Sequence, residues 1–128
     1  MAEPYDGKKI VIVDDDPDIA GAIQAALSDS GAELFVANDG NTALRLVGEQ
    51  APDIVVLDIM LPQKSGFLVL EKLRQGIPSN EKPHVIMITG NQGKRHKQYA
   101  EALGVREYNN KPFAMDQLTA AIEKWLVK

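Results

Sequence analysis

Three carboxylates follow two of the most apolar stretches of this chain, and they are the residues best suited to chemistry. Asp58 comes directly after the run Ile-Val-Val-Leu at positions 54–57, and Asp14 and Asp15 come directly after Ile-Val-Ile-Val at 10–13. Short apolar runs rich in β-branched residues are typical of strands buried on both faces. An acid at the carboxyl end of such a strand lies at the rim of the sheet, where open parallel α/β folds bind their ligands.

Two further strand ends add a hydroxyl and an ammonium group to this set. Thr89 follows the apolar run at 85–88, and Lys111 follows the mixed run at 105–109. Neighbouring carboxylates repel one another unless a cation or protons neutralise them. The chain has no cysteine, and the pattern places His84 and His96 far from the acids, so all-oxygen ligation favours Mg²⁺ or Mn²⁺. A metal among carboxylates, a lysine and a hydroxyl suits phosphoryl transfer, and a carboxylate can itself accept the group as an aspartyl phosphate.

The elements that must position these residues follow from the apolar pattern. Five strands are expected, at 10–13, 34–37, 54–57, 85–88 and 105–109, and each precedes a segment with helical spacing. This alternation predicts an α/β fold: a doubly wound, five-stranded parallel sheet of order 2-1-3-4-5, flavodoxin-like, with helices on both faces. The switch point of that order lies between the first and third strands, where the three carboxylates would meet.

The helices are predicted with different degrees of support from their sequences. Asp16-Pro17 marks the first helix, with the aspartate as N-cap and proline at the first helical position, and Gly31 marks its end. The expected core-facing residues are Ile19, Ile23, Ala26 and Leu27, then Ala43, Leu44 and Val47, then Phe67, Leu70 and Leu73, and finally Leu118, Ile122 and Trp125. The segment 92–103 has few apolar residues, so we expect it to be the least firmly held helix.

Composition limits the class of protein. The 128 residues suit a single domain spanning 1–128, with its core at about 8–127. A net charge of −4 argues against direct nucleic-acid binding. We find neither a membrane-spanning apolar stretch nor a secretory signal, which predicts a cytoplasmic protein. The basic cluster at 94–97 is expected to be a solvated helix face; a docking patch for an acidic partner is the alternative.

In these motifs the chain resembles the receiver domains of two-component response regulators. The shared motifs are the acidic pair after the first apolar run, the set Asp58, Pro62 and Gly66, the pair Thr89-Gly90, and Tyr108 with Lys111-Pro112-Phe113. The resemblance extends from about Lys8 to Val127. It implies a stand-alone or excised switch module that takes a phosphoryl group from a histidine kinase or phosphotransfer protein.

The resemblance also implies a role for each matching residue. Asp58 would be the phosphoryl acceptor, and the metal would be held by Asp15, Asp58 and the backbone carbonyl of Met60, with Asp14 acting through a water. Lys111 would hold one phosphoryl oxygen, and Thr89 would move to bond another. Tyr108 would then turn inward and couple the site to the surface made by the fourth helix, fifth strand and fifth helix. The resemblance further implies that this chain could form a phosphorylation-dependent dimer through that surface, and the family usually has a cis peptide at the position of Lys111-Pro112.

Some positions depart from the family pattern, and other functions were weighed. Gln63, Lys64 and Ser65 stand where relatives often carry Asp or Gly, and Met60 and Asn91 occupy variable positions expected to tune the lifetime of the phosphoryl group. A Mg²⁺-dependent phosphatase would need a second acid at Met60. A flavin-binding module would need a phosphate loop where this chain has three acids, and a degenerate receiver would lack a key side chain. The cognate kinase and the output pathway do not follow from the sequence.

Overall fold

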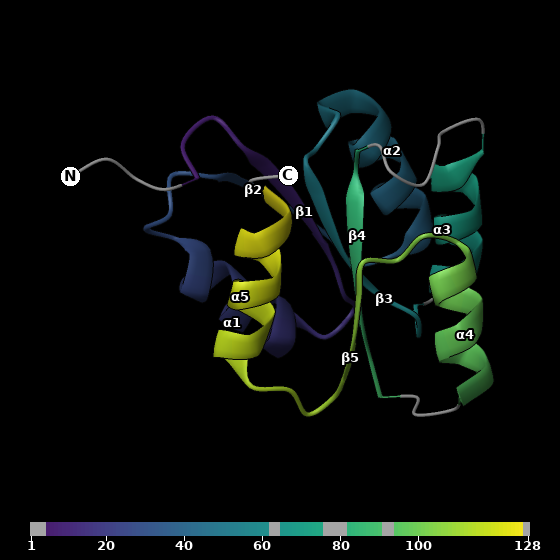
Figure 1. Cartoon of the computed structure of the whole chain (residues 1–128). Helices are drawn as coiled ribbons and strands as arrows, with labels where there is room; N and C mark the ends of the chain where they lie inside the picture. The colour runs from purple at the N-terminus through teal and green to yellow at the C-terminus, as the bar shows by residue number, and fades with distance from the viewer. Residues whose placement is uncertain (1–4, 62–64, 76–81, 91–93, 127–128) are drawn as a thin grey trace.

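The computed structural model describes residues 5–61, 65–75, 82–90 and 94–126, and these form one layered α/β arrangement (Figure 1). The strands are β1 (Lys9–Val13), β2 (Glu33–Ala37), β3 (Ile54–Asp58), β4 (His84–Thr89) and β5 (Glu107–Asn110). The helices are α1 (Pro17–Leu27), α2 (Gly40–Gln50), α3 (Gly66–Arg74), α4 (Lys94–Ala102) and α5 (Met115–Leu126). Among the described helices, none is long and apolar enough to cross a bilayer.

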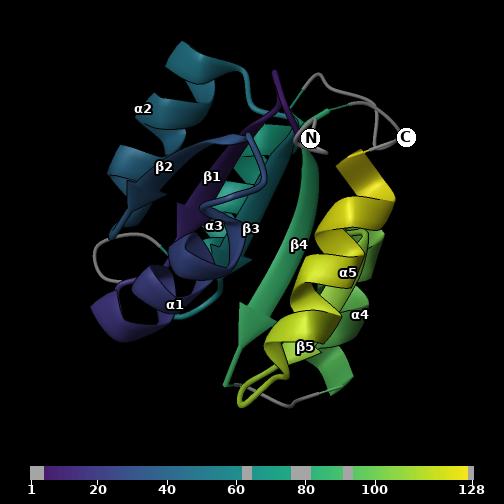
Figure 2. The same ribbon diagram turned by 90° about the vertical axis from the view of Figure 1, so that its left-hand side faces the viewer.

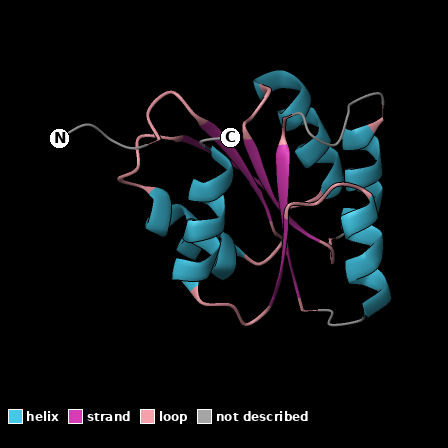
Figure 3. Cartoon of the chain, viewed as in Figure 1, coloured by secondary structure: helices cyan, strands magenta, loops and turns pink. Residues whose placement is uncertain are grey.

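The predicted sheet is confirmed. Its strands are all parallel and lie in the order β2-β1-β3-β4-β5. Helices α1 and α5 cover one face, and α2, α3 and α4 cover the other, as the secondary-structure colouring of Figure 3 makes plain. Because every strand runs the same way, all five carboxyl ends lie at one edge of the sheet, the lower edge in Figure 1.

The core has two layers because alternate residues of each strand point to opposite faces. In β1, Val11 and Val13 face the layer under α2, α3 and α4, whereas Ile10 and Ile12 face α1 and α5. Every residue of β3 and β4 is buried, as expected for central strands covered on both sides. The edge position predicted for the mixed fifth strand is also confirmed, since β5 pairs only with β4 in this sheet.

Helix starts follow local capping rules. Asp16 caps α1 as predicted, with its carboxylate accepting from the backbone N–H of Asp18 at 2.9 Å. Asp39 caps α2 through the N–H of Thr42 at 2.8 Å, and Ser65 caps α3 through the N–H of Leu68 at 3.3 Å. Each cap satisfies a backbone donor that has no partner inside the helix.

Three details of the helix prediction are corrected. Ala26 is exposed, because the buried stripe of α1 runs through Ala20, Ile23 and Leu27. The helix itself ends at Leu27, and Gly31 lies beyond it, in the connection to β2 with φ of 89°. Trp125 packs against the core but is only partly buried, and its indole N–H donates to Glu107 Oε2 at 3.1 Å. Four other predicted core-facing residues are also only partly buried: Ile19, Leu44, Val47 and Phe67.

Candidate functional site

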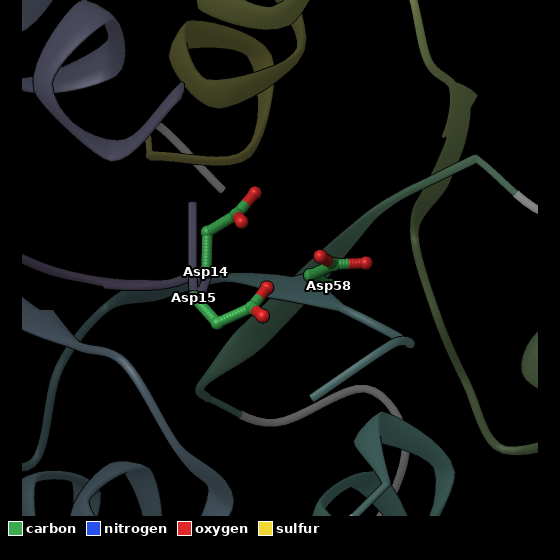
Figure 4. Close-up of side chains that lie close together, drawn as sticks. All are labelled: Asp14, Asp15 and Asp58. Atoms are coloured by element: carbon green, nitrogen blue, oxygen red, sulfur yellow. The ribbon is translucent and has the colours of Figure 1, made fainter. Parts of the chain in front are cut away.

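The three carboxylates predicted at the strand ends do converge. Oxygen atoms of Asp14, Asp15 and Asp58 all lie within 4.8 Å of one another. Figure 4 shows the first two side chains entering this space from the end of β1 and the third from the end of β3. Figure 2 shows why they meet, since β1 and β3 lie next to each other in the sheet.

Lys111, directly after the carboxyl end of β5, contacts two of these acids. Its ammonium nitrogen lies 3.0 Å from Asp14 Oδ2 and 3.1 Å from Asp58 Oδ2. The contacts link residues 97 and 53 positions apart in the chain. The carbonyl of Thr89 at the end of β4 accepts from the Lys111 N–H at 2.6 Å, which fixes the backbone from which the lysine extends. The sheet therefore delivers one cation to two carboxylates.

Burial separates the three acids. Asp14 and Asp58 are 1% and 2% exposed, whereas Asp15 is exposed to solvent. Only four polar or charged side chains are buried in the described part of the chain, and these two acids and Thr89 are three of them. Buried polar groups are costly unless they are paired or functional, so their concentration at one sheet edge makes this edge the candidate site.

The remaining carboxylate oxygens of the buried acids are held by backbone donors. Asp58 Oδ1 accepts from the N–H of Met60 at 3.1 Å, and Asp14 Oδ1 accepts from the N–H of Asp16 at 2.9 Å. Because Lys111 contacts the other oxygen, Oδ2, both carboxylate oxygens of each of these side chains have a partner. A carboxylate fixed in this way meets an incoming group without first reorganising.

The electrostatics of the site follow from burial and from these partners. Desolvation by burial raises the pKa of Asp58 above its ordinary value, Asp14 raises it further, and the Met60 N–H and Lys111 oppose the rise. Burial alone would lower the pKa of Lys111, but its hydrogen bonds and charge interactions with Asp14 and Asp58 raise it overall. Lys111 is therefore held as a cation beside an acid whose pKa is raised by burial.

A glycine sets the distance between α3 and the end of β3. The N–H of Gly66 donates to the carbonyl of Ile59 at 2.7 Å. A Cβ at this position would lie 2.3 Å from the carbonyl oxygen of Asp58 and 2.6 Å from Ile59 Cα. Sequence motifs included Gly66 without giving it a role; its role is this close backbone approach, which positions the segment carrying Asp58.

Thr89 and Tyr108 lie where the strand pattern predicts. Thr89 is fully buried at the carboxyl end of β4. Tyr108 is partly buried on β5, packs against the core layer under α2, α3 and α4, and has a pKa raised by burial. The cis peptide implied at Lys111-Pro112 is present, and a second one at Lys82-Pro83 had no signal in the sequence. The motif residue Pro62, the departures Gln63 and Lys64, and the variable position Asn91 lie outside the described residues.

The donor set suits a hard divalent cation. All three side chains offer carboxylate oxygens, and no histidine joins the cluster within the described residues. Such ligands favour Mg²⁺ or Mn²⁺ over softer metals. Asp14 already has both oxygens engaged, by Lys111 and by the Asp16 N–H, whereas Asp15 is open to solvent. The residues present therefore fit a divalent metal.

A hollow of about 480 Å³ opens beside this site, between α1 and the segment that joins β5 to α5. Ile19 and Ala22 of α1 form one wall, and Pro112, Phe113 and Met115 form the other. Lys111 lines it as well. An apolar surface thus reaches the lysine that contacts Asp58.

Comparison with known proteins gives a consistent result. A family model described as the response regulator receiver domain matches residues 10–123. The structure is similar to the receiver domain of Francisella response regulator 1452, with a TM-score of 0.85 and 30% identity over 94% of this chain and 98% of that one. It is also similar to a CheY-like receiver domain protein from Methanospirillum hungatei JF-1, with a TM-score of 0.85 and 28% identity over 94% of each chain. The BeF3-activated N-terminal receiver domain of Klebsiella pneumoniae RstA matches with a TM-score of 0.83 and 27% identity, over 94% of this chain and 100% of that one.

Proposed function

This chain belongs to the response regulator receiver domains, the phosphoacceptor switches of two-component signalling, and we propose that Asp58 is its phosphoryl acceptor. The observation that carries the proposal is the contact of Lys111 with both Asp14 and Asp58 at the end of the central strand β3. A carboxylate fixed by a backbone N–H and an ammonium group, at the switch point of a parallel sheet, is placed to react with a ligand bound at that edge.

The proposed reaction transfers a phosphoryl group from a phosphohistidine. A carboxylate oxygen of Asp58 forms the new P–O bond while the P–N bond breaks, and its electron pair stays with the imidazole nitrogen of the histidine kinase or phosphotransfer protein. Lys111 moves its contact from the Asp58 carboxylate to a phosphoryl oxygen, and it keeps Asp14 as partner. Charge neutralisation of this kind supplies most of the catalysis in phosphoryl transfer.

Mg²⁺ or Mn²⁺ is the proposed cofactor. Asp15, Asp58 and the carbonyl of Met60 would hold the ion, with Asp14 contributing through a water. Held there, the ion would add to the neutralisation of charge on the phosphoryl oxygens. The chain acts as a switch with self-catalysed transfer and slow self-dephosphorylation rather than as a turnover phosphatase. Met60, 62% exposed, gives it no acid two residues after the acceptor.

The proposed output runs through Thr89 and Tyr108 to the α4-β5-α5 face. Phosphorylation shifts an equilibrium between two conformers: Thr89 bonds the phosphoryl group and Tyr108 packs further inward. The altered face then binds a downstream partner or a second copy of the chain. The phosphodonor protein docks at the opposite side of the site, where the apolar hollow beside Lys111 can accept side chains of a helix.

The test is chemical phosphorylation followed by intact mass measurement. With Mg²⁺ and acetyl phosphate, the wild type should gain the mass of one phosphoryl group, and Asp58→Ala should gain none. Asp16→Asn is the matched control, because asparagine keeps the α1 cap and Asp16 lies outside the carboxylate cluster. An unmodified wild type, or an undiminished gain in Asp58→Ala, would contradict the proposal.

A further inference from the structure

A second hollow, of about 420 Å³, lies at the opposite end of the sheet from the carboxylates. It is formed between α2 and α3 and by the segments that lead into β3 and β4, and we call it the α2–α3 groove. Its apolar walls come from Leu44, Val47, Pro52, Leu73 and Pro83. Its volume lies within the range of natural small-molecule sites, about 300–1,000 Å³, and its mainly apolar lining is typical of them.

Gly48 of α2 lines this groove and is exposed to solvent. It lies inside the helix, where glycine is less favourable than alanine by about 1 kcal/mol. Nothing lies within 4 Å of a Cβ built at this position. Neither a close packing contact nor a positive φ therefore requires glycine here. A larger side chain at this lining position would therefore meet open space beside the groove.

The rim of the groove is positively charged. Lys72 and Lys82 line it, and no acidic residue is among its described lining residues. The ammonium group of Lys82 lies 2.6 Å from Asp53 Oδ1, which neutralises part of its charge. No carboxylate in the described part of the chain lies within ion-pair distance of Lys72. An apolar body with a negative end would thus match both the walls and the rim.

We propose that the α2–α3 groove binds a small amphiphilic carboxylate, a molecule with an apolar chain or ring and one carboxylate group. The apolar part lies along Leu44, Val47 and Leu73, in the space that Gly48 leaves open. The carboxylate lies at the rim, where Lys72 is its ion-pair partner. The site is about the size of one such molecule and is separate from the phosphoryl site, so binding does not depend on Asp58.

Decanoate is a suitable probe, used below its micelle concentration. In two-dimensional ¹⁵N–¹H spectra of the full chain, decanoate should give saturable shifts at Gly48, Leu73 and their neighbours. Decanol has the same apolar body without the charge and should bind about two- to five-fold more weakly, as expected for the loss of one exposed ion pair. Lys72→Gln should weaken decanoate by a similar factor and leave decanol unchanged.

Gly48→Leu fills the groove and should abolish the shifts. Gly21→Leu is the matched control, because Gly21 also lies inside a helix with open space around a Cβ, but on α1 and away from the groove. Gly48→Ala should raise Tm, which shows that packing tolerates a side chain there even if Gly48→Leu folds poorly.

The proposal fails if decanoate gives no saturable shifts at these residues, or if Gly48→Leu binds it as well as the wild type does. Equal affinity for decanol and decanoate would rule out the carboxylate contact. A fall in Tm on Gly48→Ala would show that packing needs the glycine, and would overturn the argument from open space. Asp58→Ala should bind decanoate normally, so this result is independent of the phosphorylation test.

Discussion

Asp14, Asp15 and Asp58 lie together beside a single ammonium group, and the balance of charge among these four side chains decides the chemistry of the site. Lys111 contacts Asp14 and Asp58, and Asp15 is not among its ion-pair partners in the described structure. One ammonium cannot neutralise three carboxylates, so an excess of negative charge remains beside a buried acid whose pKa is already raised. This imbalance favours the binding of a divalent cation and disfavours any ligand that arrives as an anion without one.

Asp15→Asn should therefore affect stability in opposite directions with and without metal. Without metal, the variant should be more stable than the wild type, because a charge that repels the other two is gone. With Mg²⁺ at ten times its Kd, the wild type should gain about 1.4 kcal/mol, and Asp15→Asn should gain much less. Thermal unfolding with added Mg²⁺ and with EDTA measures both effects.

Asp29→Asn is the control for this experiment, because Asp29 is exposed in the connection between α1 and β2. It should keep the full response to Mg²⁺. Equal stabilisation of Asp15→Asn and the wild type by Mg²⁺ would mean that Asp15 is not a ligand.

At the scale of elements, the site depends on how closely helices approach strand ends. The N-terminus of α3 touches the backbone of Asp58 and Ile59 through Gly66. α4 is attached differently: of its described side chains only Ala100 is buried. Phe67 of α3 instead packs against the rings of His96 and Tyr99, at centroid distances of 5.4 and 5.2 Å.

Gly66→Ala should disturb the acceptor directly. Its methyl group would lie within 3.0 Å of the Asp58 backbone, so the strand end or α3 must move. We expect a loss of about 1–3 kcal/mol in the free energy of unfolding and a slower reaction with acetyl phosphate. Denaturant titration and the rate of mass increase measure the two effects.

The comparison variant is Gly21→Ala, which places a methyl group in open space on α1. It should gain up to about 1 kcal/mol from helix propensity and phosphorylate normally. If Gly66→Ala were as stable and reacted as fast with acetyl phosphate as Gly21→Ala, the close approach of Gly66 to the end of β3 would not matter for the site.

Phe67→Ala should loosen α4 without unfolding the rest of the molecule. Removing an aromatic pair costs about 0.5–1.5 kcal/mol beyond the lost apolar area, and α4 has little other burial to compensate. Amide hydrogen exchange should become several-fold faster in α4 and stay unchanged in α1, which packs on the opposite face of the sheet from Phe67. Uniformly faster exchange would instead indicate global destabilisation, and the weak attachment predicted for this helix would be wrong.

At the scale of the whole molecule, the two ends of the sheet have different charge environments. The carboxyl end carries the acids, and the amino end carries a cationic group of residues around His84. Burial lowers the pKa of His84, and repulsion from Arg106, Lys82 and Arg74 lowers it further, with Asp53 opposing. Arg106 Nε donates to His84 Nδ1 at 3.3 Å, and the ring of Trp125 lies 5.4 Å from the imidazole.

This arrangement makes the protein less stable in mild acid. His84 has a lower pKa when folded than when unfolded, so the unfolded chain takes up its proton first as the pH falls below about 6.5. The free energy of unfolding should then fall by at most about 1.4 kcal/mol per pH unit, and this contribution should level off below the folded pKa. His84→Gln keeps an acceptor for Arg106 and should remove that part of the slope.

Urea denaturation between neutral pH and mild acid, for the wild type and His84→Gln, measures the difference in slope. Parallel curves for the wild type and His84→Gln would show that protonation of His84 does not couple to folding.

Much of the fold follows from local pattern. Four-residue apolar runs that end in acids identified β1 and β3, and a parallel sheet with right-handed crossovers leaves few strand orders. The errors at Ala26, Gly31 and Trp125 arose where helical spacing alone does not say which neighbour covers a residue. Trp125 looked like core but lies beside the edge strand, where Glu107 and Arg106 contact it.

The sequence by itself determined which residues could do chemistry and which end of the sheet they share, because side-chain type and strand direction are local properties. Only the tertiary structure decided that Lys111 reaches Asp14 and Asp58 rather than solvent, and that Gly66 must lack a side chain. It also revealed the α2–α3 groove at the other end of the sheet. These are distances between segments far apart in the chain, and they depend on how helices pack onto the sheet, which no local pattern encodes.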